Sequence, residues 1–263
     1  MGVPSDVPGD PWARLRAFTR ARIGLERCGD SLSTEALLKL QLDHAHARDA
    51  IYQSVDFAAL AARLGTDSRI LQVRSAAADR VTYVRRPDLG RQLDDRSRSL
   101  LEGERAQGPW DVAFVIADGL SSAAVNDHAA AVLVACTQRL AGWKRAPIVL
   151  AAAARVALGD EISVLLNVDL CVVLIGERPG LSVANSLGIY LTWRPRIGHR
   201  DADRNCVSNI HGDGLSYEQA ADKVSWLLSE ARRRRLTGTA LKEDTTSRLL
   251  EPPNGQPPHL SEE

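Results

Sequence analysis

The residues best suited to chemistry lie in three short stretches rich in charged or hydrogen-bonding side chains. They are residues 155–156, 176–180 and 204–211. The first two follow apolar runs that are predicted to be strands, and ligands of an open parallel sheet bind outside the carboxyl ends of its strands. We therefore expect these stretches to form one binding site for a polar ligand.

The segment 171–180, CVVLIGERPG, shows this arrangement most clearly. Its unbroken apolar run contains β-branched residues and predicts a strand buried on both faces. The charged pair Glu177 and Arg178 follows the expected end of the strand. Pro179-Gly180 is a turn signal, and Pro179 also disfavours helix at the residue before it. A strand followed by a solvated turn would give the same pattern, so both interpretations stay open.

Cys206 lies in the polar sequence DRNCVSNIH, with Asn209 and His211 close by. Catalytic cysteines use such partners, but the fold rather than the local sequence normally brings them together. The density of polar residues thus favours a binding loop over a nucleophile, and a buried, inert cysteine is a further interpretation. The four cysteines are widely spaced and form no CxxC pair, which argues against a zinc site and against a disulfide framework.

Ser121 is a second candidate nucleophile, because GLSSA is one residue off the nucleophile elbow GxSxG. His128 and Asp160 are the conceivable partners, but the order Ser, His, Asp is not that of the hydrolases with this elbow. The alternative is that a serine here caps a helix. His44 and His46 lack further ligands at metal-binding spacing, which favours a solvated helix face. Neither GxGxxG nor GxxxxGK[ST] occurs, which argues against a nicotinamide enzyme and an NTPase.

Length and charge exclude further classes of protein. The 263 residues suffice for one large domain or two small ones with a full core. The formal net charge of zero argues against a nucleic-acid-binding protein. No stretch approaches the roughly 20 apolar residues of a transmembrane helix, and the N-terminus lacks the apolar core of a signal peptide. We expect a cytoplasmic protein, or one in a compartment filled from the cytoplasm, without a membrane partner.

The elements that position these stretches alternate between strands and helices. Strands are predicted at residues 70–74, 80–85, 112–117, 147–151, 170–175 and 188–193. Helices are predicted at residues 12–23, 33–52, 56–64, 91–105, 121–140 and 160–166, and a long one begins at the capping box of residues 216–219. This alternation predicts an α/β fold, a Rossmann-like, mostly parallel sheet with helices on both faces. The expected organisation is a disordered leader (1–11), a helical N-terminal segment (12–105), an α/β domain (110–242) and a disordered tail (243–263).

Several longer segments carry a resemblance to a known family. They include YVRRPDLGRQL, ARVALGDEI, VVLIGERPGL, SLGIYLTWRPR and DRNCVSNIHGDGLSYEQAA. From about residue 15 to residue 242 the chain resembles the small subunit of ethanolamine ammonia-lyase. GERPGL and DRxCxSNI are hallmarks of this family and occur here in the right order.

The resemblance implies a subunit of an adenosylcobalamin-dependent lyase that converts ethanolamine to acetaldehyde and ammonia. The family's large subunit is a TIM barrel that binds ethanolamine, and the small subunit closes over the cofactor. Equal numbers of the two subunits assemble into a twelve-chain complex. Carried over by motif, Val156, Glu177 and Cys206 would contact the cobalamin, whereas no catalytic residue and no metal ligand is expected on this chain. No DxHxxG stretch occurs, so the cofactor should keep its own dimethylbenzimidazole on cobalt.

The location of the protein stays open, and two rival functions are kept beside the one that the resemblance implies. Longer members of the family carry an extended leader associated with packaging into a bacterial microcompartment, whereas the leader of this chain is short. Both the cytoplasm and such a microcompartment are therefore kept as locations. One rival function is a stand-alone serine hydrolase that uses Ser121. The other is a free-standing cobalamin carrier or chaperone.

Overall fold

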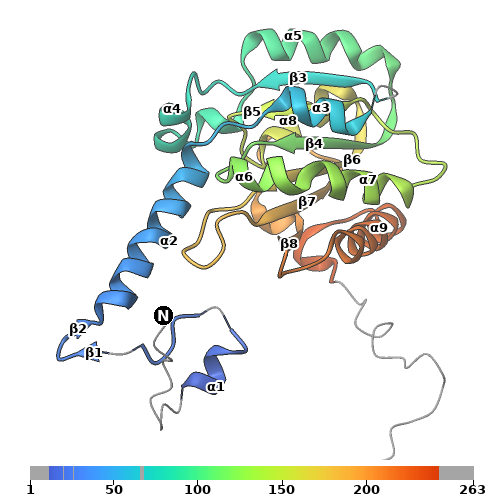
Figure 1. Cartoon of the computed structure of the whole chain (residues 1–263). Helices are drawn as coiled ribbons and strands as arrows, with labels where there is room; N and C mark the ends of the chain where they lie inside the picture. The colour runs from blue at the N-terminus through green and yellow to red at the C-terminus, as the bar shows by residue number, and fades with distance from the viewer. Residues whose placement is uncertain (1–11, 20, 26, 66–67, 243–263) are drawn as a thin grey trace, which may run out of the picture.

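A six-stranded sheet forms the centre of the molecule (Figure 1). The computed structural model describes residues 12–19, 21–25, 27–65 and 68–242, so the leader and the tail predicted at the two ends lie outside the described residues. The strand order is β3-β5-β4-β6-β7-β8. The first four strands in this order are parallel, and β7 is antiparallel to both of its neighbours. The predicted α/β fold with a mostly parallel sheet is confirmed.

Helices cover both faces of this sheet. Its strands are β3 (Ile70–Arg74), β4 (Trp110–Ala117), β5 (Ile148–Ala152), β6 (Val168–Gly176), β7 (Leu187–Trp193) and β8 (Asn205–Ile210). One face is covered by α3 (Phe57–Leu64), α6 (Ser122–Ala124), α7 (Ala130–Gln138) and α9 (Tyr217–Arg234). The other face is covered by α5 (Asp95–Glu104) and α8 (Leu158–Leu166). A π-helical turn, Val125–Ala129, joins α6 to α7, and 3-10 turns lie at Leu89–Arg91, Arg105–Gln107, Asp201–Asp203 and Gly238–Ala240.

The burial of strand β6 explains the unbroken apolar run at residues 171–175. Val172 and Leu174 join the core beneath α7 and α9. Cys171 and Val173 join the core beneath α8. Successive side chains of a strand point to opposite faces, so a strand covered on both sides must be apolar throughout. The doubly buried strand predicted in this segment is confirmed.

Two secondary-structure predictions in the N-terminal half of the chain are wrong. The segment predicted as a strand at residues 80–85 is helix α4 (Arg80–Arg85). Asp79 caps this helix, because its side chain accepts a hydrogen bond from the N–H of Thr82 at 2.7 Å. The helix predicted at residues 12–23 is limited to α1 (Ala13–Arg16), which has no capping side chain at its start.

The polar stretch that follows residue 203 is a strand rather than the predicted loop. It forms β8 at the edge of the sheet and pairs with β7. Val207 and Ile210 are buried in the core beneath α9, whereas Cys206 and Ser208 are exposed on the opposite face. An edge strand covered on one face tolerates polar residues on the other, which is why its composition resembles that of a loop.

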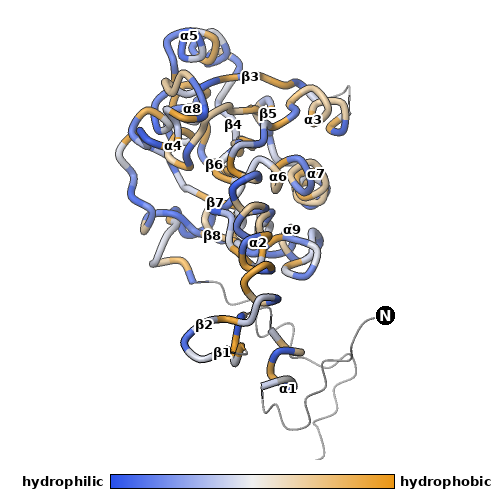
Figure 2. Tube along the Cα trace, turned by 60° about the vertical axis from the view of Figure 1, so that its left-hand side comes forward, coloured by the Kyte–Doolittle hydropathy of each residue, from blue (hydrophilic) through white to orange (hydrophobic). Residues whose placement is uncertain are grey.

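Helix α2 (Thr34–Tyr52) leads away from the sheet (Figure 1). It follows a hairpin of β1 (Arg27–Cys28) and β2 (Ser31–Leu32). Ser33 caps it by accepting a hydrogen bond from the N–H of Ala36 at 3.3 Å. Of its 19 residues, Ala47 and Ala50 are buried, and Figure 2 shows hydrophobic stretches along its length. The helix predicted at residues 33–52 is confirmed.

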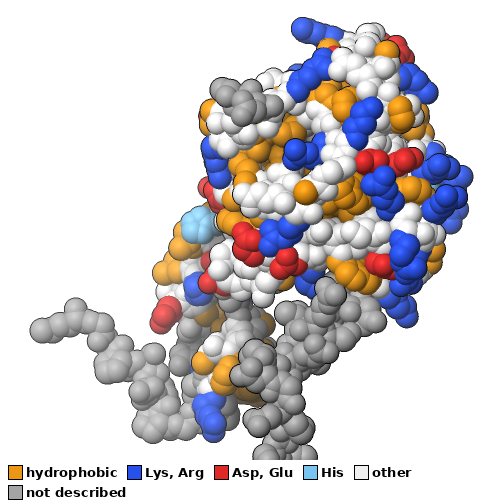
Figure 3. Space-filling model, turned by 90° about the vertical axis from the view of Figure 1, so that its right-hand side faces the viewer, with side chains coloured by type: hydrophobic (Ala, Val, Ile, Leu, Met, Phe, Trp, Pro, Cys, Tyr) orange, Lys and Arg blue, Asp and Glu red, His pale blue; other side chains and the backbone are white. Residues whose placement is uncertain are grey.

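The surface carries charges of both signs. On the side shown in Figure 3, Lys and Arg side chains lie among Asp, Glu and hydrophobic side chains. This mixture agrees with the zero net charge of the chain. Among the helices that the structure describes, none has the length and apolar character needed to cross a membrane.

Candidate functional site

Two of the three predicted cofactor residues lie on one face of the sheet. Register pairs place Val173, Tyr190 and Cys206 side by side on β6, β7 and β8. Paired residues of neighbouring strands direct their side chains to the same face, and Val173 packs beneath α8. Helix α8 does not fully cover the next two strands, so Tyr190 is half-buried and Cys206 is exposed. We call the surface formed by Glu177, Gly188, Tyr190 and Cys206 the open face.

The start of β7 holds the carboxylate of Glu177 in place. The Ser186 hydroxyl donates a hydrogen bond to Oε2 of Glu177 at 2.5 Å. The N–H of Glu177 donates to the carbonyl of Ser186 at 3.0 Å. A Cβ atom at Gly188 would lie 2.9 Å from Oε1 of Glu177, so a side chain there would displace the carboxylate. Oε1 thus lies over Gly188, where it can accept a hydrogen bond from a ligand.

Tyr190 and Cys206 form a neutral pair on the open face. Surrounding protein atoms desolvate both groups and raise the pKa of the Tyr190 hydroxyl and of the Cys206 thiol. The two residues are paired across β7 and β8. Both groups are therefore protonated at neutral pH and available for hydrogen bonding. A raised thiol pKa is the opposite of what an activated cysteine nucleophile has.

The Asn and His residues near Cys206 shape the turn after β8. Nε2 of His211 lies 2.8 Å from Oδ1 of Asn209, and Nδ1 of His211 accepts a hydrogen bond from the N–H of Asp213 at 3.3 Å. Asn209 has a left-handed φ of 64°, and its carbonyl accepts a hydrogen bond from the N–H of Leu215 at 2.8 Å. The local density of polar residues thus has a structural explanation.

Val156, the third predicted residue, lies in the turn between β5 and α8. It is half-buried and packs against the core beneath α8. It is therefore on the same side of the sheet as Glu177 and Cys206, at the carboxyl end of β5 and not on the open face itself. The structure brings Glu177 and Cys206 together and places Val156 at the edge of the same side.

A buried ion pair ties α8 to β8. The guanidinium of Arg204 donates to both carboxylate oxygens of Asp160, at 2.7 and 2.6 Å, and the two side chains are 1% and 2% exposed. Arg204 also donates to Oγ1 of Thr192 at 2.9 Å. The helix predicted to begin at residue 160 begins at Leu158, and Ala157 occupies its N-cap position. The pair joins the segments that carry Val156 and Cys206.

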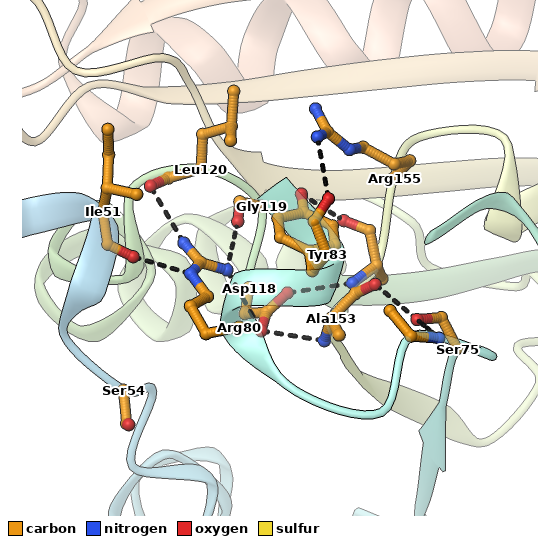
Figure 4. A network of polar contacts seen from close by, with 12 residues as sticks. Ile51, Ser54, Ser75, Arg80, Tyr83, Asp118, Gly119, Leu120, Ala153 and Arg155 are labelled. Atoms are coloured by element: carbon orange, nitrogen blue, oxygen red, sulfur yellow. Dashed lines mark hydrogen bonds and ion pairs between the residues drawn. The ribbon is translucent and has the colours of Figure 1, made fainter. Parts of the chain in front are cut away.

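Arg155, the other residue of the first predicted stretch, belongs to a polar network at the carboxyl ends of β4 and β5 (Figure 4). Asp118 accepts hydrogen bonds from the N–H groups of Ala153 and Ala154, at 2.8 and 3.0 Å. Arg80 lies 3.6 Å from the same carboxylate. Burial raises the pKa of Asp118 above its ordinary value. The network fixes the loops that follow the two strands.

The hydrolase arrangement considered for Ser121 does not form. The Ser121 hydroxyl caps α6 and donates to the carbonyl of Ala184 at 2.7 Å. Nδ1 of His128 lies 2.8 Å from the hydroxyl of Tyr217, and burial lowers the pKa of this histidine. Asp160 is held in the buried ion pair described above. The prediction that this serine caps a helix is confirmed.

Two hollows lie along the sheet, and the described residues form no metal-binding cluster. Within the ranges that the structure describes, no group of three or more His, Cys, Asp and Glu side chains is arranged to hold a metal ion. His44 and His46 are exposed on α2. A hollow of about 490 Å³ along β8 is lined in part by Cys206 and Ser208. A hollow of about 320 Å³ lies at the opposite end of the strands, beside Trp110. The first hollow adjoins the open face.

Tyr190, Ser186 and Gly188 are the residues of this site that sequence reasoning missed. Tyr190 and Gly188 lie within the strand predicted at residues 188–193, on alternate positions of one face. That alternation was visible in the sequence, but the face that would stay uncovered was not. Ser186 carried no signal, because its role depends on the antiparallel return of β7 beside Glu177.

Comparisons with known proteins agree along nearly the whole chain. A sequence model of the family described as ethanolamine ammonia-lyase light chain (EutC) matches residues 9–242. Three relatives are each named ethanolamine ammonia-lyase small subunit. The protein of Xanthomonas campestris pv. campestris (strain B100) is 51% identical, over 95% of this chain and 94% of its own length. That of Rhodopseudomonas palustris (strain BisA53) is 53% identical, over 88% and 89%. That of Pseudomonas fluorescens (strain Pf0-1) is 47% identical, over 95% and 93%.

Proposed function

Because the chain belongs to the ethanolamine ammonia-lyase light-chain family, we propose that it helps to bind and enclose adenosylcobalamin against the large subunit of that enzyme. Family membership makes the chain part of an ammonia-lyase complex. In this proposal the large subunit binds ethanolamine, and equal numbers of the two subunits form a twelve-chain assembly. The small chain alone is then inactive.

The open face carries the observation that supports this proposal. The edge of a corrin ring bears amide side chains, which are uncharged and both donate and accept hydrogen bonds. Glu177 offers them a fixed acceptor, and the protonated Tyr190 and Cys206 suit a neutral polar ligand. Gly188 has no side chain, which leaves room for the Glu177 carboxylate over β7. The residues present therefore fit the cofactor.

The chain's own residues would position the cofactor and keep water away. Glu177 would orient the ring through a hydrogen bond to an amide. Cys206 would pack against it, and Val156 would give apolar contact at the carboxyl end of β5. When bound, adenosylcobalamin supplies the organic radical that starts the conversion of ethanolamine to acetaldehyde and ammonia. Enclosure by two subunits limits side reactions of that radical with water.

Acetaldehyde release tests the proposal. It is measured with adenosylcobalamin and ethanolamine for the co-purified complex, for this chain alone and for the large subunit alone, and light scattering gives the mass of each. We expect release from the complex alone. Full activity and full cofactor affinity of the large subunit without this chain would contradict an enclosing role. A stable monomer that binds cobalamin and ignores the large subunit would favour a carrier.

A further inference from the structure

Arg155 holds a partly buried positive charge at the carboxyl end of β5. Its guanidinium lies 4.4 Å from the centre of the Tyr83 ring, and its Nη2 donates to the carbonyl of Tyr83 at 3.3 Å (Figure 4). The N–H of Arg155 donates to the carbonyl of Gly90 at 2.8 Å, and its side chain packs beside Gly90. Backbone and side chain are thus both held in place.

This charge has no anionic partner within the described parts of the chain. Five other arginines that are at least half-buried pair with a carboxylate: Arg22, Arg80, Arg98, Arg139 and Arg204. No described carboxylate lies within 4.0 Å of Arg155, and its Nη1 forms no hydrogen bond to the described residues. Its Nε is buried without a partner as well. An unpaired charge of this kind is costly, which points to a ligand.

The neighbouring carboxylate cannot serve Arg155. Arg80 lies against the same Tyr83 ring at 4.8 Å, donates to the carbonyls of Gly119 and Leu120 at 2.7 and 3.0 Å, and pairs with Asp118. Asp118 is further occupied by two backbone N–H groups. Two guanidinium groups therefore share one ring while a single carboxylate neutralises one of them. The network keeps one positive charge, and that charge is on Arg155.

We propose that Arg155 binds the phosphodiester of the nucleotide loop of adenosylcobalamin. The inference rests on the proposed function. The side chains of the corrin ring are neutral amides, so the phosphodiester is the anionic group that the cofactor offers, and a guanidinium is well suited to phosphate oxygens. Arg155 directly precedes Val156, and β5 lies two strands from β6, roughly 10 Å from the strand that ends beside Glu177. One ligand of cobalamin size spans this distance.

The nucleotide is also attached on the side of the corrin that this chain would face. The adenosyl group must point to ethanolamine, which the proposed function places on the large subunit. The dimethylbenzimidazole nucleotide lies on the opposite face of the ring. A small subunit that closes that face would meet the phosphodiester, and Arg155 holds an unpaired, partly buried charge at this edge of the sheet.

The test compares two ligands that differ in the phosphodiester. Adenosylcobalamin and adenosylcobinamide, which lacks the nucleotide loop, are titrated by absorbance against the assembled complex. The variants are Arg155→Met, Arg155→Lys and the control Arg91→Met, which removes an exposed charge nearby. We expect Arg155→Met to weaken adenosylcobalamin binding by about tenfold to a hundredfold, adenosylcobinamide binding to stay unchanged, and Arg155→Lys to recover part of the loss.

Each other outcome overturns the inference. Equal weakening of both ligands would mean that Arg155 only supports the loop. Unchanged adenosylcobalamin binding would mean that it is no ligand. Loss of assembly in Arg155→Met would assign Arg155 to a carboxylate of the large subunit instead. Glu177→Ala separates this inference from the proposed function. If Glu177→Ala weakens both ligands and Arg155→Met weakens neither, the proposed function stands without the phosphate site.

Discussion

Breaking the buried ion pair between Arg204 and Asp160 should destabilise the chain strongly. Arg204→Met removes the two hydrogen bonds to Asp160, of 2.7 and 2.6 Å, together with the one to Thr192, and leaves a carboxylate that is 2% exposed without its cation. Removing one partner of such a pair costs about 3–5 kcal/mol, which corresponds to a melting temperature lower by roughly 6–20 °C for a domain of this size. The pair also joins α8 to β8, so the loss should loosen the segment that carries Cys206.

Thermal and denaturant unfolding of Arg204→Met, of Asp160→Asn and of the double variant measures this prediction. The double variant Asp160→Asn with Arg204→Met carries no buried charge, and we expect it to be more stable than the sum of the single losses by at least about 2 kcal/mol. The matched control is Arg194→Met, whose partner Asp169 lies 3.7 Å away with both side chains more than half exposed. It should cost less than about 1 kcal/mol. A loss in Arg204→Met as small as in this control would refute the reasoning.

Two further predictions concern Gly188 and His128. Gly188→Ala places a Cβ 2.9 Å from Oε1 of Glu177 and should weaken cofactor binding by about tenfold, whereas Gly103→Ala, which meets no atom within 4 Å, should leave binding unchanged. Unchanged binding in Gly188→Ala would contradict the placement of the carboxylate. Burial lowers the pKa of His128 below its ordinary 6.5, so its contribution to stability is complete above pH 6.5 and is lost as the pH falls through the folded-state pKa. Unfolding free energy measured between about pH 8 and pH 5 should fall less in His128→Gln than in wild type, and equal slopes would contradict the assignment.

The sequence allowed the sheet to be predicted where one element carries a strong local signal. The apolar run of β6 and the capping box that begins at Ser216 fall in this class, because a doubly covered strand and a capped helix each leave a pattern in neighbouring residues. The segment at residues 80–85 gave the wrong result, because its β-branched residues favour a strand while the cap at Asp79 and the tertiary setting favour a helix.

The site was predictable only in part. Glu177 and Cys206 were located by motif, and the register between β6, β7 and β8 explains why they share a face. The pairing of Arg204 with Asp160 joins residues 44 positions apart, and no local pattern announces a contact of that kind. Which residues of β7 stay exposed likewise depends on how far α8 extends over the sheet.

Cofactor titration of the assembled complex with Glu177→Ala tests the central claim most directly. The exposed Glu102→Ala, on the distant helix α5, is the control for loss of a carboxylate. A hydrogen bond to a charged acceptor is worth about 1.5–3 kcal/mol, so adenosylcobalamin should bind about tenfold to a hundredfold more weakly in Glu177→Ala, while the ethanolamine affinity of the loaded complex changes little. An unchanged cofactor dissociation constant, in a complex of unchanged mass, would show that the open face does not bind the cofactor through Glu177.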